Sequence, residues 1–109
     1  MKTLCEKNRT TMNKINILGI EYTVKHVDVG DTEYPFAGRC IPDDQLIVIR
    51  TGMQPDYTEQ VLIHEIIHAL LWQLGEKERF NDEEFTDRLA MGLRLTFPNL
   101  LKESEHVAD

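Results

Sequence analysis

One stretch of the chain reads VLIHEIIHALLW, residues 61–72, and its spacing decides the class of fold. The apolar residues around His64 and His68 predict a buried helix over about residues 57–74, which ends at Gly75. Side chains four positions apart on a helix share one face, about one turn apart. The pattern therefore predicts two imidazoles that point at a single position in space.

Glu65 completes the pattern His-Glu-x-x-His, which is typical of zinc peptidases. It lies about 100° around the helix from His64, close enough to flank a metal without ligating it. A carboxylate there can take a proton from a water that the metal acidifies. Ionisable side chains in so apolar a stretch are costly to bury without partners, and a metal provides them. We therefore predict that His64 and His68 bind Zn²⁺ and that Glu65 is the catalytic base.

A catalytic zinc ion usually has three protein ligands, so one more side chain must come from elsewhere. No third histidine follows His68 at the spacing of three-histidine sites, and His106 lies in a polar terminal segment. The remaining source is the acidic start of a second helix, which we expect to begin near Asn81 and to end before Pro98. Its candidate ligands are Asp82, Glu83 and Glu84.

Helical geometry favours Glu83 among these three. The buried side of the second helix is expected to carry its large apolar residues, Phe85, Leu89 and Leu93. Glu83 precedes Ala90 by seven positions and so points along the border of that side. Glu84 points away from the core and is expected to form a capping box with Asn81. Asp82 is better centred on the inward side, but its side chain is shorter.

Two segments together resemble the ImmA/IrrE family of zincin-like metallopeptidases, which occurs in phages and mobile elements. They are the motif helix, residues 61–69, and the second-helix segment Glu83-x-x-Thr86-Asp87-x-Leu89-Ala90. The resemblance covers about residues 15–97. It implies a minimal zincin-like domain in which Glu83 is the third zinc ligand.

The chain departs from the family pattern at Thr86, where the family has Ala, and at Leu89, where it has Phe. Asp87 falls where the family has Asn or Asp, a position suited either to a contact with a ligand histidine or to an exposed carboxylate. Three further side chains are candidates to stabilise an oxyanion, although nothing in the sequence ties them to the site: His26, Tyr34 and Tyr57.

The residues before the motif helix predict a small sheet. Over residues 15–27 the side chains alternate with period two and indicate one half-buried strand. Two further extended segments, about 37–41 and 45–50, flank Pro42-Asp43-Asp44 and are expected to form a hairpin. Residues 46–49 are apolar on both faces, which indicates a strand that is covered on both sides or faces a cleft. The resemblance implies that this strand borders the cleft and pairs with an extended substrate. The fold class is therefore α+β, a small antiparallel or mixed sheet packed on two helices.

Length and composition fit one small domain, because the chain has 109 residues, of which 41% are hydrophobic and 28% charged. We expect a single zincin-like domain over residues 12–100. A disordered N-terminal tail over residues 1–11 and a loose acidic tail over residues 101–109 would flank it. The core is expected to include Leu71, Trp72 and Phe85.

The net charge of −7 argues against a general nucleic-acid binder, which would carry clusters of Lys and Arg. No stretch is apolar enough to span a membrane, and no apolar run follows Met1-Lys2 as in a secretory signal. Cys5 and Cys40 form no Cys-x-x-Cys pair and are expected to be inert thiols. These features predict a cytoplasmic protein.

The sequence as a whole predicts a zinc-dependent metallopeptidase that hydrolyses peptide bonds with Glu65 as the base. Its expected partner is a protein or peptide substrate, and the family suggests a transcriptional regulator of a phage or mobile element. One alternative is a catalytically silent, zinc-stabilised interaction module, against which the intact Glu65 argues. The other is a structural protein without a metal.

Overall fold

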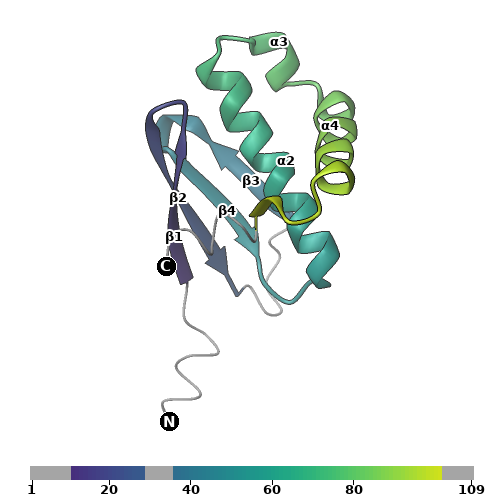
Figure 1. Ribbon diagram of the computed structural model, residues 1–109. Helices are drawn as coiled ribbons and strands as arrows, with labels where there is room; N and C mark the ends of the chain where they lie inside the picture. The colour runs from purple at the N-terminus through teal and green to yellow at the C-terminus, as the bar shows by residue number, and fades with distance from the viewer. Residues whose placement is uncertain (1–10, 29–35, 102–109) are drawn as a thin grey trace.

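The computed structural model describes residues 11–28 and 36–101 (Figure 1). Predictions for Cys5, Tyr34 and His106 lie outside these ranges, as do those for most of both tails. Thr11 already belongs to the first strand, and Leu101 packs against a core cluster, so the described domain extends slightly beyond residues 12–100.

Four strands form one mixed sheet. They are β1 (Thr11–Ile17), β2 (Ile20–Val27), β3 (Gly38–Ile41) and β4 (Leu46–Arg50), in the spatial order β1-β2-β4-β3. The β1–β2 and β3–β4 pairs are antiparallel, whereas β2 and β4 run parallel. The predicted α+β class with a small mixed sheet is confirmed, and so is the predicted hairpin, whose connection is the short 3-10 helix η1 (Pro42–Asp44).

The prediction of one strand over residues 15–27 is wrong, because the chain folds back at Leu18-Gly19. Both residues have positive φ, 51° and 86°, as in the tight turns that match the twist of a hairpin. The Asn16 side-chain oxygen accepts a hydrogen bond from the Gly19 N–H at 2.8 Å. The apolar side chains that point toward the core have odd residue numbers in β1 and even residue numbers in β2. This change in the phase of the alternation marks the turn, and it was overlooked in the sequence.

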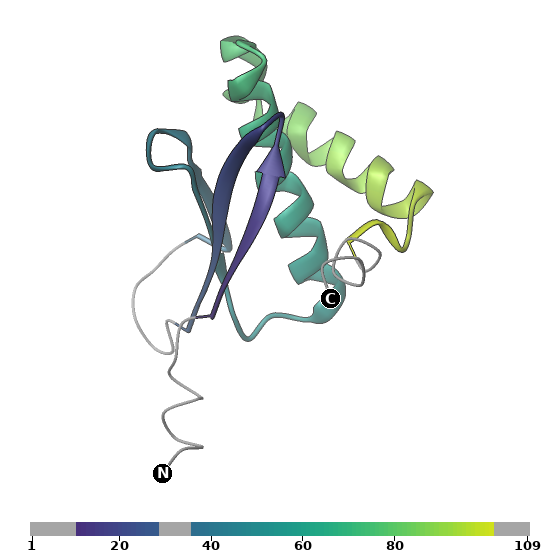
Figure 2. The same cartoon turned by 60° about the vertical axis from the view of Figure 1, so that its left-hand side comes forward.

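Three α-helices follow the sheet in the described residues: α2 (Pro55–Gln73), α3 (Lys77–Phe80) and α4 (Glu83–Thr96). They lie on one face of the sheet (Figures 1 and 2). Helix α2 packs on the sheet, mainly against β3 and β4, and α4 packs against α2. The predicted bounds of the motif helix lie within about two residues of the observed ends. The short helix α3 lies between the two predicted helices, where no helix was expected.

Helix α2 is the middle layer and is buried on two sides, which explains its apolar sequence. On the sheet side, Val61 and Ala69 join a cluster with Tyr22, Val24, Ile47 and Ile49. On the other side a second cluster joins α2 to α4 through Ile63, Ile67, Leu71 and Ala90. An amphipathic pattern would have left one of these faces polar.

The predicted buried side of α4 is wrong in part. Phe85 and Leu89 are 36% and 40% exposed, and Trp72 of α2 is 38% exposed, whereas Thr86 and Ala90 are fully buried. Small residues at a helix contact let the two backbones approach closely. The close contact of α4 with α2 thus selects the small residues and turns the larger ones outward.

The predicted capping box of Asn81 and Glu84 is also wrong. The N-cap of α4 is Asp82, whose side chain accepts a hydrogen bond from the Phe85 N–H at 3.0 Å. Glu84 pairs instead with Arg88 at 3.0 Å along the exposed side of α4. Asn81 donates to the Lys77 carbonyl at 3.1 Å, which ends α3.

β4 cannot pair with an extended substrate, contrary to the prediction, because it is hydrogen-bonded on both sides, to β2 and to β3. The edge strand beside α2 is β3. Across residues 11–28 and 36–101, no helix combines the length and the apolar character needed to cross a membrane.

Candidate metal centre

Three side chains converge where α2 meets the start of α4. His64 and His68 come from successive turns of α2, and Glu83 is the first residue of α4. The two imidazole Nε2 atoms are 3.1 Å apart, and Glu83 Oε1 is 2.9 Å from His64 Nε2 and 3.2 Å from His68 Nε2. The three side chains thus offer one donor atom each within 4.8 Å of one another, a group that can hold a metal ion.

The spacing of these donors suits a small four-coordinate ion. Ligand atoms bound tetrahedrally to zinc at about 2.0–2.1 Å are about 3.3 Å from one another. The observed separations of 2.9–3.2 Å are close to that value. Two imidazole nitrogens and one carboxylate oxygen are also a donor set that zinc accepts in catalytic sites.

The other ring nitrogen of His64, Nδ1, faces Asp87 on α4, whose Oδ1 lies 3.4 Å away. A carboxylate in this position can accept the Nδ1 proton of an imidazole whose Nε2 binds a metal, whereas in the metal-free cluster the nearer Glu83 carboxylate competes for the proton at Nε2. The sequence left Asp87 open between a contact with a ligand histidine and an exposed carboxylate. In the structure both descriptions apply, because the Asp87 carboxylate contacts His64 and is 60% exposed.

The three close contacts within the cluster cannot all be satisfied by two neutral imidazoles and a carboxylate. If both Nε2 atoms carry a proton, each can donate to Glu83, but the two nitrogens then face each other as donors at 3.1 Å. If one Nε2 lacks its proton, its contact with Glu83 joins two lone pairs. A cation between the three donors would satisfy all three contacts and would offset the nearby carboxylates.

The electrostatics of Glu83 follow from the same contacts. Burial alone would raise the pKa of its carboxyl, but hydrogen bonds and positive charge from His64 and His68 outweigh that effect and lower it. The Glu83 side chain is nevertheless 72% exposed, whereas those of His64 and His68 are 15% and 6% exposed. The cluster is therefore closed on the α2 side and open to solvent beside Glu83.

His68 is covered by an aromatic side chain that the sequence analysis did not single out. The Phe80 ring, at the end of α3, meets the His68 ring edge-on with centroids 5.1 Å apart, and Trp72 packs on Phe80 at 5.2 Å. His68 Nδ1 is buried without a hydrogen-bond partner among the described residues. The sequence carried no signal for Phe80, because its position depends on the short helix α3.

Glu65 points from α2 toward the edge strand β3 and is only 7% exposed. Burial raises the pKa of its carboxyl to about 7, while the charge of His64 lowers it and that of Glu83 raises it. Within the described ranges it has no hydrogen-bond or ion-pair partner. A carboxyl group that titrates near neutral pH beside the cluster is suited to accept and return a proton.

Gly38 of β3 makes room for Glu65, and the sequence analysis missed it. A Cβ atom at Gly38 would lie 2.5 Å from Val61 Cγ1 and 3.2 Å from Glu65 Oε2. Any larger residue would push β3 away from α2. Gly38 therefore lets the strand backbone pass close to the Glu65 carboxylate.

Cys40, two residues further along β3, is a free half-buried cysteine. Burial raises the pKa of its thiol to about 12, and the charge of Glu65 adds to this effect. The thiol therefore stays protonated at neutral pH, which agrees with an inert role.

A hydrogen-bond chain ties α4 to α2 behind the cluster. Arg94 Nε donates to Gln60 Oε1 at 2.8 Å, and Gln60 Nε2 donates to the Asp87 carbonyl at 3.4 Å. This chain helps to fix the position of the α4 residues that face His64. The sequence analysis did not single out Gln60 or Arg94.

The remaining candidates lie apart from the three ligands. Asp82 caps α4 and Glu84 pairs with Arg88, so neither joins the cluster. His26 on β2 and Tyr57, which is 52% exposed in the first turn of α2, make no hydrogen bond to the cluster among the residues that the structure describes.

Comparisons of the chain with protein-family models, with curated proteins and with solved structures found no match. The resemblance to the ImmA/IrrE family therefore stays a prediction from the sequence.

Proposed function

We propose that this protein is a zinc-dependent peptidase whose metal ligands are His64, His68 and Glu83. The observation that carries the proposal is the convergence of these three donors, 2.9–3.2 Å apart, beside a buried carboxyl group whose pKa is raised to about 7. A purely structural zinc site has four protein ligands and no need of a base. Here three protein donors and the exposed side of Glu83 leave room for water and substrate.

The chemistry divides between the ion and the chain. Zinc at this site would polarise the scissile carbonyl and acidify the attacking water. Glu65 takes the proton from that water and passes it to the nitrogen of the leaving amine. Asp87, 3.4 Å from His64 Nδ1, would help to orient the His64 ring for binding through Nε2.

The expected substrate is an extended peptide segment of a protein. β3 is an edge strand, and it passes Glu65 at Gly38, so a peptide paired with its free edge would run beside the base. A transcriptional regulator of a phage or mobile element is the substrate that the resemblance suggests.

The first test is the metal content of purified protein after dialysis against zinc. We expect one equivalent in the wild type and its loss in the variants His64→Ala, His68→Ala and Glu83→Ala, with Glu84→Ala as the matched control that keeps it. Full occupancy in Glu83→Ala would remove Glu83 from the ligand set.

The second test separates a peptidase from a silent module. Zinc-loaded wild type and Glu65→Gln are incubated with a quenched-fluorescence peptide library, and cleavage is followed. We expect cleavage by the wild type only, with equal zinc in both proteins. Zinc binding without cleavage by the wild type would favour the silent interaction module instead.

A further inference from the structure

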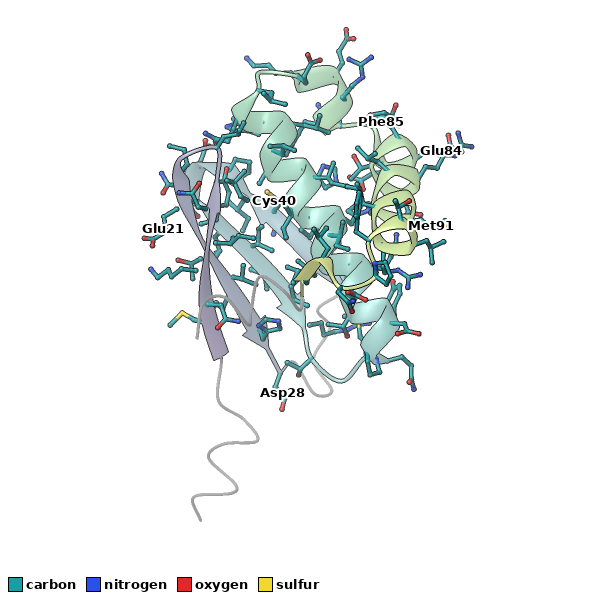
Figure 3. All side chains as sticks on the ribbon, in the orientation of Figure 1. Glu21, Asp28, Cys40, Glu84, Phe85 and Met91 are labelled. Atoms are coloured by element: carbon teal, nitrogen blue, oxygen red, sulfur yellow. The ribbon has the colours of Figure 1, made fainter. Side chains whose placement is uncertain are left out.

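The face of the sheet opposite the helices has no described helix on it (Figure 2). We call it the open face and define it by the outward side chains of the four strands. Glu21 belongs to it, and Figure 3 shows its side chain pointing away from the helices.

The centre of the open face is aliphatic. Ile41, Leu46 and Val48 lie there side by side on β3 and β4, all half-buried, and Val27 lies nearby on β2. Among the described residues, none of these four packs against either core cluster. Their apolar surface therefore adds nothing to the two clusters that hold the domain together.

Cations flank this aliphatic centre on the neighbouring strands, whereas the turn between Ile41 and Leu46 carries the exposed carboxylates of Asp43 and Asp44. In the strand register Lys25 and Arg39 stand on either side of Val48, one on β2 and the other on β3. Arg50 is level with Val27, and Lys14 on β1 pairs with Glu21 at 4.0 Å. For Lys25 and Arg50 no salt bridge is found within the described ranges.

The net charge of the four strands is opposite in sign to the net charge of the whole chain. The four strands hold four cations and one carboxylate, a net charge of +3, whereas the whole chain has −7. The rest of the chain therefore has −10. A positive face on an acidic protein directs an acidic partner to that face.

We propose that the open face docks an acidic amphipathic α-helix of a partner protein. The helix would lie along β4, with its apolar stripe on Leu46, Val48 and Ile41. Lys25 and Arg39 are two strands apart, about 10 Å, which matches the diameter of a helix of about 10–12 Å. Carboxylates on both flanks of the helix would reach these two cations, and a further one would reach Arg50.

The same features argue against two other occupants. A single-stranded nucleic acid usually binds on several aromatic side chains, whereas the outward residues of β1 to β4 include no Phe, Tyr or Trp. The exposed Phe36, just before β3, lies against the Arg39 guanidinium at 5.8 Å and is a single ring beside the face. A second copy that used its own open face would bring like charges together. An acidic amphipathic helix would cover the aliphatic centre with its apolar side and pair its carboxylates with the flanking cations.

The test uses a fluorescein-labelled synthetic helix with a leucine stripe flanked by Glu, and a matched peptide with Lys in place of Glu. Fluorescence anisotropy measures binding to the full chain, and amide chemical shifts locate the site. We expect the Glu peptide to bind at least about tenfold more tightly than the Lys peptide and to shift the amides of β4. The paired reversal Lys25→Glu with Arg39→Glu should weaken binding by a similar factor.

Lys77→Glu on α3 is the control reversal and should leave binding unchanged, with folding of all variants checked by circular dichroism. The proposal would be overturned if the Glu peptide did not bind, or if the two peptides bound equally well. It would also be overturned if the control reversal weakened binding as much as the paired reversal does. Tighter binding of a single-stranded RNA oligonucleotide, or self-association that the reversals abolish, would overturn it as well. Zinc content should stay the same in every variant, so this result is independent of the proposed peptidase.

Discussion

Replacing Glu65 by Gln should stabilise the metal-free protein at pH 8 much more than at pH 5. The pKa of the Glu65 carboxyl rises from 4.5 to about 7 on folding, mainly because burial penalises its charge. Between these two values the folded state therefore holds more protons than the unfolded state. Stability is then lost as the pH rises through this window.

The size of the effect follows from the shift. Each pKa unit corresponds to about 1.4 kcal/mol, so the shift of about 2.5 units lowers the unfolding free energy by about 3 kcal/mol above pH 7. Between pH 5 and pH 8 the loss amounts to about 2.5 kcal/mol, since part of it has already occurred by pH 5. Gln keeps the shape of the side chain but does not titrate, so the variant escapes this loss.

The assay is urea denaturation of both proteins in EDTA at pH 5 and pH 8. The stability difference between Glu65→Gln and wild type should grow by about 2–3 kcal/mol between the two pH values. Glu84→Gln is the control, because that side chain is 75% exposed and no burial opposes its charge. A difference that is the same at both pH values would refute the reasoning that burial raises the pKa of the Glu65 carboxyl.

Three further substitutions test other parts of the site. Asp87→Ala should weaken zinc binding by about tenfold, measured by competition with a chromogenic chelator, because the His64 ring loses its partner; unchanged affinity would contradict this role. Gly38→Ala should lower the unfolding free energy by about 1–3 kcal/mol, because the added Cβ would meet Val61. If the variant is as stable in urea as the wild type, β3 can move aside and the contact is not tight. Thr86→Val should raise the unfolding free energy by about 1 kcal/mol, because the buried Thr86 hydroxyl has no partner among the described residues, and a lower denaturation midpoint would count against this.

The motif helix and the hairpin of β3 and β4 were predictable because their signals are local. A continuous apolar run around His64 and His68 specifies a buried helix, and Pro42-Asp43-Asp44 between two extended segments specifies a turn. The turn at Leu18-Gly19 was missed because an alternating pattern looks continuous unless its change of phase is noticed.

The orientation of α4 was harder to predict, because hydrophobicity alone does not say which side of a helix packs closest. Glu83, Thr86, Ala90 and Leu93 share one side, and the small residues among them let α4 approach α2. Glu83 lies in contact with the histidines, although the apolar residues used to orient the helix, Phe85 and Leu89, are partly exposed; its role as a metal ligand stays a prediction.

The sequence by itself determined which atoms can take part in the site on α2, because residues four apart on one helix must share a face. It also determined the α+β class, through the change from period two to a helical run. Only the tertiary structure decided that Glu83 and Asp87 meet the two nitrogens of His64, and that Glu65 is buried against Gly38. These contacts join residues far apart in the chain, and their geometry depends on how closely α4 and β3 pack against α2, which no local pattern encodes.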